Sequence, residues 1–252
     1  MTYRNAEKIV VLGRDMRMLI IKKDNSISTK VKIITNWGQT EIIKPNFKIR
    51  EDFLNNLGIN DKFVLLWAGN MGIPHGIVDI LNAAKKLADN DKIHFVFIGS
   101  GSKKNWLMHQ VKKNGLSNFT FLQPLPRSDQ KLFLNSCDIV LSSLIEGMYG
   151  ISVPSRIYNI FSAGKPILAI GERDTELAQV ISQYKVGWNI IPSDTDAFVK
   201  TILYALSNKN ELIEMGKRAR KVAVDQFSER IVIDEYMQLF SDLIPNNKIK
   251  SN

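Results

Sequence analysis

The residues best suited to chemistry lie together between Glu146 and Pro166, in the stretch EGMYGISVPSRIYNIFSAGKP. This stretch contains a carboxylate, a loop of small residues, a Ser155–Arg156 pair and a predicted helix that ends at Gly164. Sugar hydroxyls need hydrogen-bond acceptors such as Glu146, and phosphates need backbone N–H groups, a helix N-terminus and a cation such as Arg156. The stretch therefore predicts a ligand that carries both hydroxyls and phosphates.

Arg156 and Glu146 each allow two interpretations. Pro154 suits the first turn of a helix, with Ser152 or Val153 near the cap, so Arg156 is expected in that turn. A cation there opposes the helix macrodipole at a cost of roughly 0.3–1 kcal/mol, unless an anion binds between them. A phosphate contact accounts for Arg156, and an ion pair between domains is the alternative. For Glu146, just past a strand end, hydroxyl binding competes with a plain surface carboxylate.

Two glycine-rich loops, GNMGIPHG (69–76) and GSG (99–101), each follow a predicted strand. Glycines let the backbone approach a phosphate, and the helix after the first loop offers free N–H groups. The first loop matches neither the Walker A pattern nor the dinucleotide fingerprint GxGxxG, and for both loops a simple turn is the alternative. His75 lies in the first loop, within reach of such a phosphate, whereas His94 and His109 are expected to be structural.

The sequence shows no pattern of metal ligands. Its three histidines are far apart, and Cys137, the single cysteine, lies in an apolar segment and is expected to be a buried thiol. Asp194 and Asp196 begin a predicted helix remote from the glycine loops. We therefore expect no metal and no bound cofactor.

The chain is basic, with a net charge of +9 and a pI near 9.5. This charge favours anionic partners such as nucleotides, lipid phosphates or an anionic membrane surface. No RNA-binding motif is present and the lysines are scattered, so nucleic acid is not expected. No apolar run reaches the roughly 20 residues that span a bilayer, and the N-terminus lacks a signal-peptide layout. We expect a cytoplasmic location, with peripheral contact at the inner face of the cytoplasmic membrane as a further expectation.

The middle of the chain alternates predicted strands with predicted helices. The predicted strands are 63–69, 94–101, 119–125, 138–143, 166–171 and 187–192. Helices between them, such as 77–90 and 174–184, have the length that indicates an α/β fold with a doubly wound parallel sheet. Ser128 is the predicted N-cap of the helix that follows 119–125. Ligands bind at the carboxyl ends of the strands in such sheets, which is where both glycine loops and the segment SSLIEG (142–147) fall.

The two ends of the chain do not fit this sheet. We interpret residues 1–45 as the tail of a preceding domain and a hinge, and 46–228 as the parallel-sheet domain. Residues 229–244 are predicted to form a helix that packs back toward the N-terminal domain, and 245–252 a frayed polar tail.

Six segments together resemble the GT-B glycosyltransferases of the GT4 type (group 1). The similarity is to their C-terminal nucleotide-sugar-binding half, and it is greatest to the bacterial group that transfers N-acetylated or deoxy sugars in surface-polysaccharide assembly. The matching segments are IITNWG (33–38), LLWAGNMGIPHGI (65–77), FVFIGSG (95–101), FTFLQPLP (119–126), CDIVLSSLIEG (137–147) and SVPSRIYNIFSAGKPILA (152–169). The resemblance implies a Rossmann-like sheet with a remnant of the N-terminal GT-B domain.

The resemblance also implies a role for individual residues. Glu146 would match the first carboxylate of the family's Glu-x7-Glu motif, near the donor sugar, and is the expected catalytic residue. The residues from Ser152 to Arg156 would lie against the phosphates. The full set of implied donor-binding residues is Gly69, Asn70, Met71, Gly72, His75, Gly99, Gly101, Gln123, Leu125, Ser142, Gly150, Ile151, Ser152, Ser155, Arg156 and Asn159.

The sequence departs from the family pattern in places. The second carboxylate of the motif, which holds the ribose, is replaced by Asn159, and the usual Arg and Lys after the first glycine by Asn70 and His75. The family's N-terminal domain, which binds the acceptor, is expected to be missing from this chain.

The implied function is transfer of a sugar from a nucleoside diphosphate donor, with UDP expected, to a glycan or lipid-linked acceptor with retention. This chain would supply the donor-binding half and be inactive alone. The alternatives are a non-catalytic nucleotide-binding subunit of a split transferase and a sugar-nucleotide 2-epimerase of similar architecture.

Overall fold

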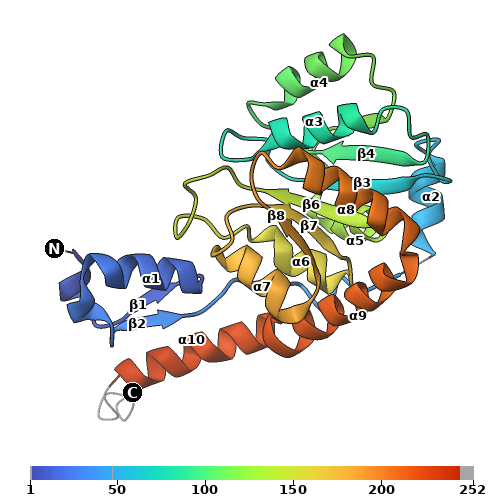
Figure 1. Ribbon diagram of the computed structural model, residues 1–252. Helices are drawn as coiled ribbons and strands as arrows, with labels where there is room; N and C mark the ends of the chain where they lie inside the picture. The colour runs from blue at the N-terminus through green and yellow to red at the C-terminus, as the bar shows by residue number, and fades with distance from the viewer. Residues whose placement is uncertain (1, 47, 245–252) are drawn as a thin grey trace.

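The computed structural model describes residues 2–46 and 48–244. Within them the chain forms a six-stranded parallel sheet, here called the main sheet, and a separate two-stranded parallel sheet (Figure 1). The main sheet has the order β5-β4-β3-β6-β7-β8. Its strands are β3 (Phe63–Ala68), β4 (Ile93–Ile98), β5 (Phe119–Leu122), β6 (Ile139–Ser143), β7 (Ile167–Ile170) and β8 (Gly187–Ile190).

The strand order confirms the predicted doubly wound α/β fold. Along the chain the sheet grows from β3 through β4 to β5, and then returns to the other side of β3 with β6. Neighbouring loops at the carboxyl ends of β3 and β6 consequently diverge, which opens a crevice at this switch point. The glycine loop after β3 and the segment after β6 both border it.

Helices cover both faces of the main sheet because its strands are apolar on both sides. Leu65 and Trp67 pack toward one face and Val64 and Leu66 toward the other, as the two-residue period of a strand requires. The first face is covered by α3 (Ile77–Lys86), α4 (Lys104–Lys113) and α8 (Thr195–Ser207). The second is covered by α2 (Ile49–Asn55), α5 (Gln130–Asn135), α6 (Arg156–Ser162), α7 (Glu176–Tyr184) and α9 (Lys209–Gln226).

The first part of the chain forms a small separate layer, here called the N-terminal unit (residues 2–33). It contains the short 3₁₀ helices η1 (Thr2–Asn5) and η2 (Asn25–Ile27), the strands β1 (Ile9–Val11) and β2 (Val31–Ile33), and the helix α1 (Arg14–Lys23). The last described helix, α10 (Glu229–Leu243), lies along this unit (Figure 1). Its Val232 and Leu239 pack with Ile34, and Val10 lies against the same cluster.

The chain passes between the N-terminal unit with α10 and the rest of the molecule at two places, near Gly38 and near Ser228. These two places, here called the chain crossings, lie side by side. Gly38 donates from its N–H to the carbonyl of Phe227 at 2.8 Å and forms a bridge with Ser228. Gly38 also lies against α6, because a Cβ there would be 2.5 Å from the carbonyl oxygen of Tyr158. The predicted tail, 245–252, lies outside the described residues.

Two predicted helix starts are wrong. Helix α6 begins at Arg156 with Ser155 as its N-cap, not at Pro154. Val153 is buried, and residues 152–154 are in neither a helix nor a strand. Likewise Ser128 is not the N-cap of the helix after β5. The chain first makes a 3₁₀ turn, η3 (Arg127–Asp129), and Asp129 then precedes α5.

Candidate functional site

A cavity of about 160 Å³ opens at the carboxyl edge of the main sheet, beside the switch point. The ends of β3 and β4 form one wall, and α5 and α6 form the other. Its lining residues are Ala68, Gly69, Ile98, Gly99, Pro124, Leu125, Gln130, Phe133, Leu134, Val140, Arg156, Asn159 and Ile160. The structure thus brings together five of the residues predicted from the sequence: Gly69, Gly99, Leu125, Arg156 and Asn159.

Arg156 supplies the positive charge of this cavity. Its guanidinium stacks over the ring of Trp67, with its carbon 4.5 Å from the ring centroid, and its Nη1 donates to the Ala68 carbonyl at 3.3 Å. Burial lowers the pKa of Arg156 to about 10, so it remains a cation near neutral pH. No carboxylate of the described residues forms an ion pair with it. A partly buried cation without a carboxylate partner is suited to an anionic ligand.

The two glycine turns that border Arg156 pack directly on each other. Gly99 has φ +137°, and a Cβ on it would lie 2.2 Å from the Gly69 carbonyl oxygen. A Cβ on Gly69 would in turn approach Arg156 Nη1 to 3.1 Å. Lys104 fixes the turn at Gly99, because its Nζ donates to the carbonyls of Gly99 and Leu122 at 2.7 and 2.8 Å. The absence of side chains here leaves backbone at the cavity mouth, beside the guanidinium.

A pair of amide side chains forms the polar part of the opposite wall. Asn159 donates from Nδ2 to Gln130 Oε1 at 2.7 Å, and its Oδ1 accepts from the Gln39 N–H at 2.9 Å. Asn159 thus joins α6 to α5 and to the chain crossing. Its own amide is engaged on both sides, whereas the amide nitrogen of Gln130 has no partner among the described residues. Gln130 is therefore the better placed of the two to meet a ligand hydroxyl.

His75 does not line the cavity and packs against Trp67. Its ring is 5.3 Å from that of Trp67, and its Nδ1 lies 3.0 Å from the Ser143 carbonyl, to which it can donate. Burial, and also the charge of Arg156, lower the pKa of His75. Ser143 Oγ accepts from the Gly76 N–H at 3.0 Å, which fixes the turn that carries the histidine.

The loop 146–152 lies beyond the cavity lining, and its backbone is largely engaged. Glu146 is exposed. The Gly150 N–H donates to Asp15 and the Ile151 N–H to the Met148 carbonyl, so neither is free for a ligand phosphate in this arrangement. Ser152 and Ser155 follow at the entry to α6, where no described backbone hydrogen bond uses their N–H groups. Any contact of Gly150 or Ile151 with the donor would therefore have to use other atoms of these residues, and their place in the donor site stays a prediction.

Other predicted residues lie outside the lining of the cavity. Met71 is fully buried, and its N–H and carbonyl bond to Ser100 and Lys103, so it holds the glycine loops together. Ser142 is also buried, and Gln123 is exposed beside the cavity. Of the remaining ones, Asn70 is exposed, Gly101 is partly buried and Gly72 is buried.

Trp67, Gln130 and Ser143 were not predicted from the sequence. An aromatic residue two positions before Gly69 was a signal for Trp67, since a strand end places its ring beside the crevice. Nothing in the sequence indicates that Gln130 would meet Asn159, because that contact depends on how α5 packs against α6.

The chain matches the family model for glycosyl transferases group 1 over residues 49–222. It is also 33% identical, over 98% of its length, to a probable glycosyltransferase of Pseudomonas aeruginosa, WbjE. The chain belongs to this glycosyltransferase family. The matched residues contain every strand of the main sheet and every residue that lines the cavity.

Further relatives agree with this membership. The chain is 27% identical over 80% of its length to the putative colanic acid biosynthesis glycosyltransferase WcaI of Escherichia coli. It spans 61% of WbjE and 50% of WcaI. Among solved structures it resembles HepE of Anabaena, determined in complex with UDP and glucose. That likeness has a TM-score of 0.81 and 15% identity, and covers 95% of this chain and 64% of HepE. It shows that the fold is one GT-B half.

Two kinds of feature are absent from the described residues. Those residues hold no cluster of three or more His, Cys, Asp or Glu side chains arranged to bind a metal ion. Within the same residues, no helix has both the length and the apolar character needed to cross a bilayer.

Proposed function

We propose that this chain is the donor-binding part of a glycosyltransferase that uses a nucleoside diphosphate sugar, with UDP as the nucleotide. The observation that carries the proposal is Arg156, a cation at the switch-point cavity with no carboxylate partner among the described residues. A diphosphate would neutralise its charge, and the backbone at Gly69 leaves room for it to approach.

The rest of the cavity supports a nucleoside. Leu125, Phe133 and Ile160 provide apolar walls for a flat base, and Gln130 provides an amide for a ribose hydroxyl. The choice of UDP is supported by HepE, whose structures contain UDP. The choice of pathway, bacterial surface-polysaccharide assembly, is supported by the names of WcaI and of WaaG, a neighbour involved in lipopolysaccharide biosynthesis.

In the proposed reaction the chain acts mainly by electrostatics. As the bond between the sugar and the diphosphate breaks, negative charge develops on the leaving phosphate, and Arg156 stabilises it without a metal ion. Glu146 would lie near the sugar, and transfer would proceed with retention. The acceptor, a glycan or a lipid-linked phosphate, would bind in the cleft facing this edge of the sheet, formed with the part of the longer relatives that this chain does not match.

Calorimetry with UDP, GDP and their glucose derivatives tests the proposal. We expect UDP to bind best and Arg156→Ala to weaken binding about tenfold, or ~1.4 kcal/mol. Arg156→Met serves as a second variant, since it keeps apolar contact with Trp67 and removes a costly charge. It should lose affinity without losing stability to urea. Absence of UDP binding at millimolar concentration would contradict the function, and equal affinity of wild type and both variants would remove Arg156 from the site.

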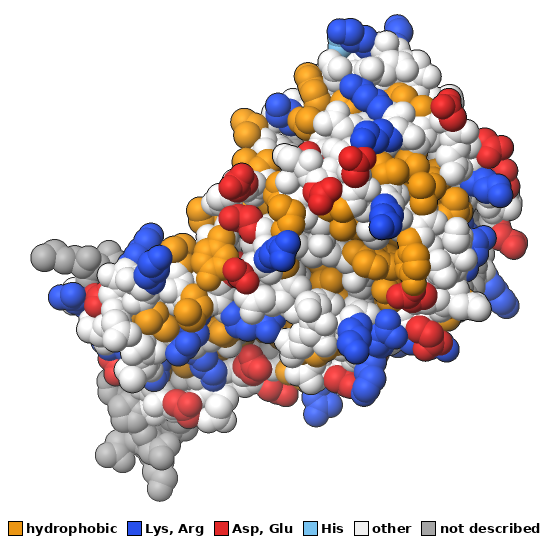
Figure 2. Space-filling model, viewed as in Figure 1, with side chains coloured by type: hydrophobic (Ala, Val, Ile, Leu, Met, Phe, Trp, Pro, Cys, Tyr) orange, Lys and Arg blue, Asp and Glu red, His pale blue; other side chains and the backbone are white. Residues whose placement is uncertain are grey.

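We also propose peripheral attraction to anionic membranes. The net charge of +9 supports it. On the face shown in Figure 2, however, Lys and Arg side chains are spread over the surface and interspersed with Asp and Glu. Attraction of this kind should be weak and should disappear as salt rises, which sedimentation with phosphatidylserine vesicles at 50 and 300 mM salt can measure.

A further inference from the structure

Two carboxylates hold four consecutive backbone N–H groups directly after Glu146. Gly147, Met148 and Tyr149 each donate to Glu172 Oε2 at 3.1 Å. The next N–H, of Gly150, donates to Asp15 Oδ2 at 3.3 Å. Glu172 follows β7 in the main domain, whereas Asp15 lies in α1 of the N-terminal unit. The loop beside the candidate site is therefore held from both parts of the molecule.

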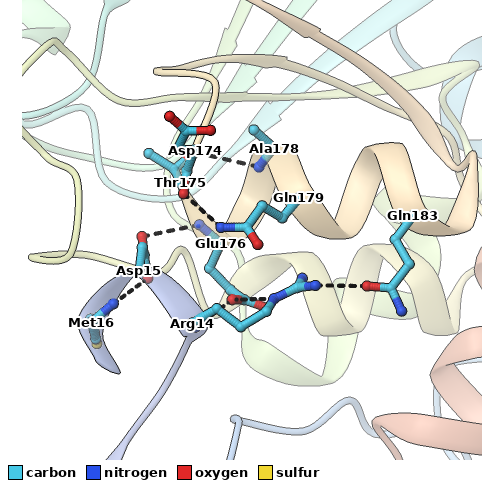
Figure 3. Close-up of polar contacts among 9 residues, drawn as sticks. All are labelled: Arg14, Asp15, Met16, Asp174, Thr175, Glu176, Ala178, Gln179 and Gln183. Atoms are coloured by element: carbon cyan, nitrogen blue, oxygen red, sulfur yellow. Dashed lines mark hydrogen bonds and ion pairs between the residues drawn. The ribbon is translucent and has the colours of Figure 1, made fainter. Parts of the chain in front are cut away.

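Asp15 joins three segments through one buried carboxylate. It is 0% exposed, its Oδ1 accepts from the Met16 N–H at 2.7 Å, and its Oδ2 accepts from Glu176 as well as Gly150. The bond to the Glu176 N–H is 3.0 Å and caps the start of α7 (Figure 3). Because one side chain makes all of these contacts, a displacement of α1 acts directly on α7 and on Gly150.

Glu176 in turn binds the start of α1 through its side chain. Its carboxylate accepts from the Arg14 N–H at 2.6 Å and from the Arg14 Nε and Nη2 at 3.0 and 2.9 Å (Figure 3). Each of the two helix starts is thus capped by a carboxylate from the other helix, which the two macrodipoles favour. Glu176 is only 5% exposed. Buried charges paired in this way tolerate little change in geometry, because a lost partner leaves a charge unsatisfied.

The loop is also in steric contact with α1. Gly150 has φ +69°, and a Cβ there would lie 2.9 Å from Leu19 and 3.1 Å from the Asp15 carbonyl oxygen. Helix α1 therefore lies against this turn, in addition to the hydrogen bond from its N–H.

We infer that Asp15 is a positioning residue for the donor site, which makes the placement of the loop 146–152 depend on how the N-terminal unit is seated. This inference rests on the proposed function. The loop carries Glu146 and leads to Ser152, so it lies at the sugar end of the site, away from the cavity beside Leu125. Loss of the Asp15–Gly150 hydrogen bond should weaken binding of the sugar-bearing part of the donor and leave binding of the nucleoside part unchanged.

The test compares Asp15→Asn with a matched control, Gln183→Ala. Gln183 accepts from Arg14 Nη1 at the same interface and has no hydrogen bond to the loop. Hydrogen exchange of residues 146–152 is measured by mass spectrometry, and affinities for UMP and UDP-glucose by calorimetry. We expect Asp15→Asn to speed exchange of the loop at least tenfold and to weaken UDP-glucose about fivefold, with UMP unchanged. The control should leave all three unchanged.

Unchanged exchange of the loop in Asp15→Asn, or an equal loss of affinity for UMP and UDP-glucose, would overturn the inference. Should Asp15→Asn fail to fold, Asp15→Glu keeps the charge but displaces the oxygens, and the same results are expected. If the wild-type protein binds neither ligand, the proposed function fails. The exchange measurement then still decides whether Asp15 holds the loop.

Discussion

The buried indole of Trp67 contacts two basic side chains: the Arg156 guanidinium lies over its ring, and the His75 ring meets it edge to face. The indole Nε1 of Trp67 has no hydrogen-bond partner among the described side chains and backbone groups. The ring thus serves mainly as a rigid platform, on which the guanidinium is held by cation–π attraction. This arrangement orients Arg156 without neutralising it, which keeps the charge available to a ligand.

The pKa of His75 should report on an anion bound beside Arg156. Burial, and then the charge of Arg156, hold that pKa below its ordinary 6.5. The unfolded chain therefore binds a proton where the folded chain does not. The stability that His75 contributes is complete above pH 6.5 and is lost as the pH falls toward the folded pKa. A bound diphosphate offsets the charge of Arg156 and raises the pKa, so binding takes up protons.

We accordingly expect affinity for UDP-glucose, whose diphosphate does not itself titrate near pH 6, to rise about threefold as the pH falls from 7.5 to 6. His75→Gln should flatten this profile. His94→Gln is the matched control, because burial also lowers the pKa of His94, but its second cause is Lys62, at the opposite edge of the sheet. Calorimetry at several pH values measures the effect. A profile that is the same in wild type and His75→Gln would contradict it.

Sequence patterns predicted which residue types would meet at the site but not how they are used. Arg156 could be identified because a cation near a helix start needs an explanation. The engagement of Gly150 with Asp15 could not, since the two are 135 positions apart and only the seating of α1 brings them together. The same applies to Asn159, whose amide is occupied by Gln39 and Gln130.

Among the elements of the fold, the two glycine turns after β3 and β4 have the tightest steric requirement. Gly99→Ala would place a Cβ 2.2 Å from the Gly69 carbonyl oxygen, at a φ of +137° that other residues rarely adopt. Because neither backbone can move without opening the main sheet, we expect a loss of about 2–4 kcal/mol in the free energy of unfolding. Urea denaturation measures this loss, and UDP affinity should fall in parallel.

Gly58→Ala and Gly115→Ala are the controls for this prediction. Both glycines have positive φ, +69° and +63°, but a Cβ at either would meet nothing within 4 Å. Each should cost only about 1 kcal/mol, the backbone strain alone. Equal losses at all three positions would mean that the contact between the turns is unimportant.

The strands of the main sheet could be predicted more reliably than the starts of its helices. Apolar runs located all six strands, three of them by a run that ends in glycine, because both faces of the sheet are buried and the runs have few alternatives. The start of α6 was predicted at Pro154 and lies at Arg156. Proline marks a permitted helix start, but the burial of Val153, which depends on the packed core, decides where the helix begins.

Across the molecule as a whole, the N-terminal unit is connected to the main domain in three ways. These are the paired chain crossings at Gly38 and Ser228, the reciprocal caps between α1 and α7, and the packing of α10. The first two join the N-terminal part of the chain directly to elements that pack on the main sheet. The packing of α10 lies on the N-terminal unit itself, so it can be weakened separately.

Leu239→Ala is expected to loosen the N-terminal unit selectively. Leu239 is 4% exposed and shares a buried cluster with Val10 of β1 and with Ile34, directly after β2, so its truncation leaves a cavity that should cost about 2–4 kcal/mol. That cost falls on contacts between α10 and the N-terminal unit, and hydrogen exchange should therefore speed up in β1, β2 and α1 while β3 and β6 remain protected. Met237→Ala is the control, because Met237 lies on the same helix and is 60% exposed. If Leu239→Ala instead speeds exchange evenly through the main sheet, the unit and the sheet unfold together, and the N-terminal unit is part of one cooperative structure with the donor site.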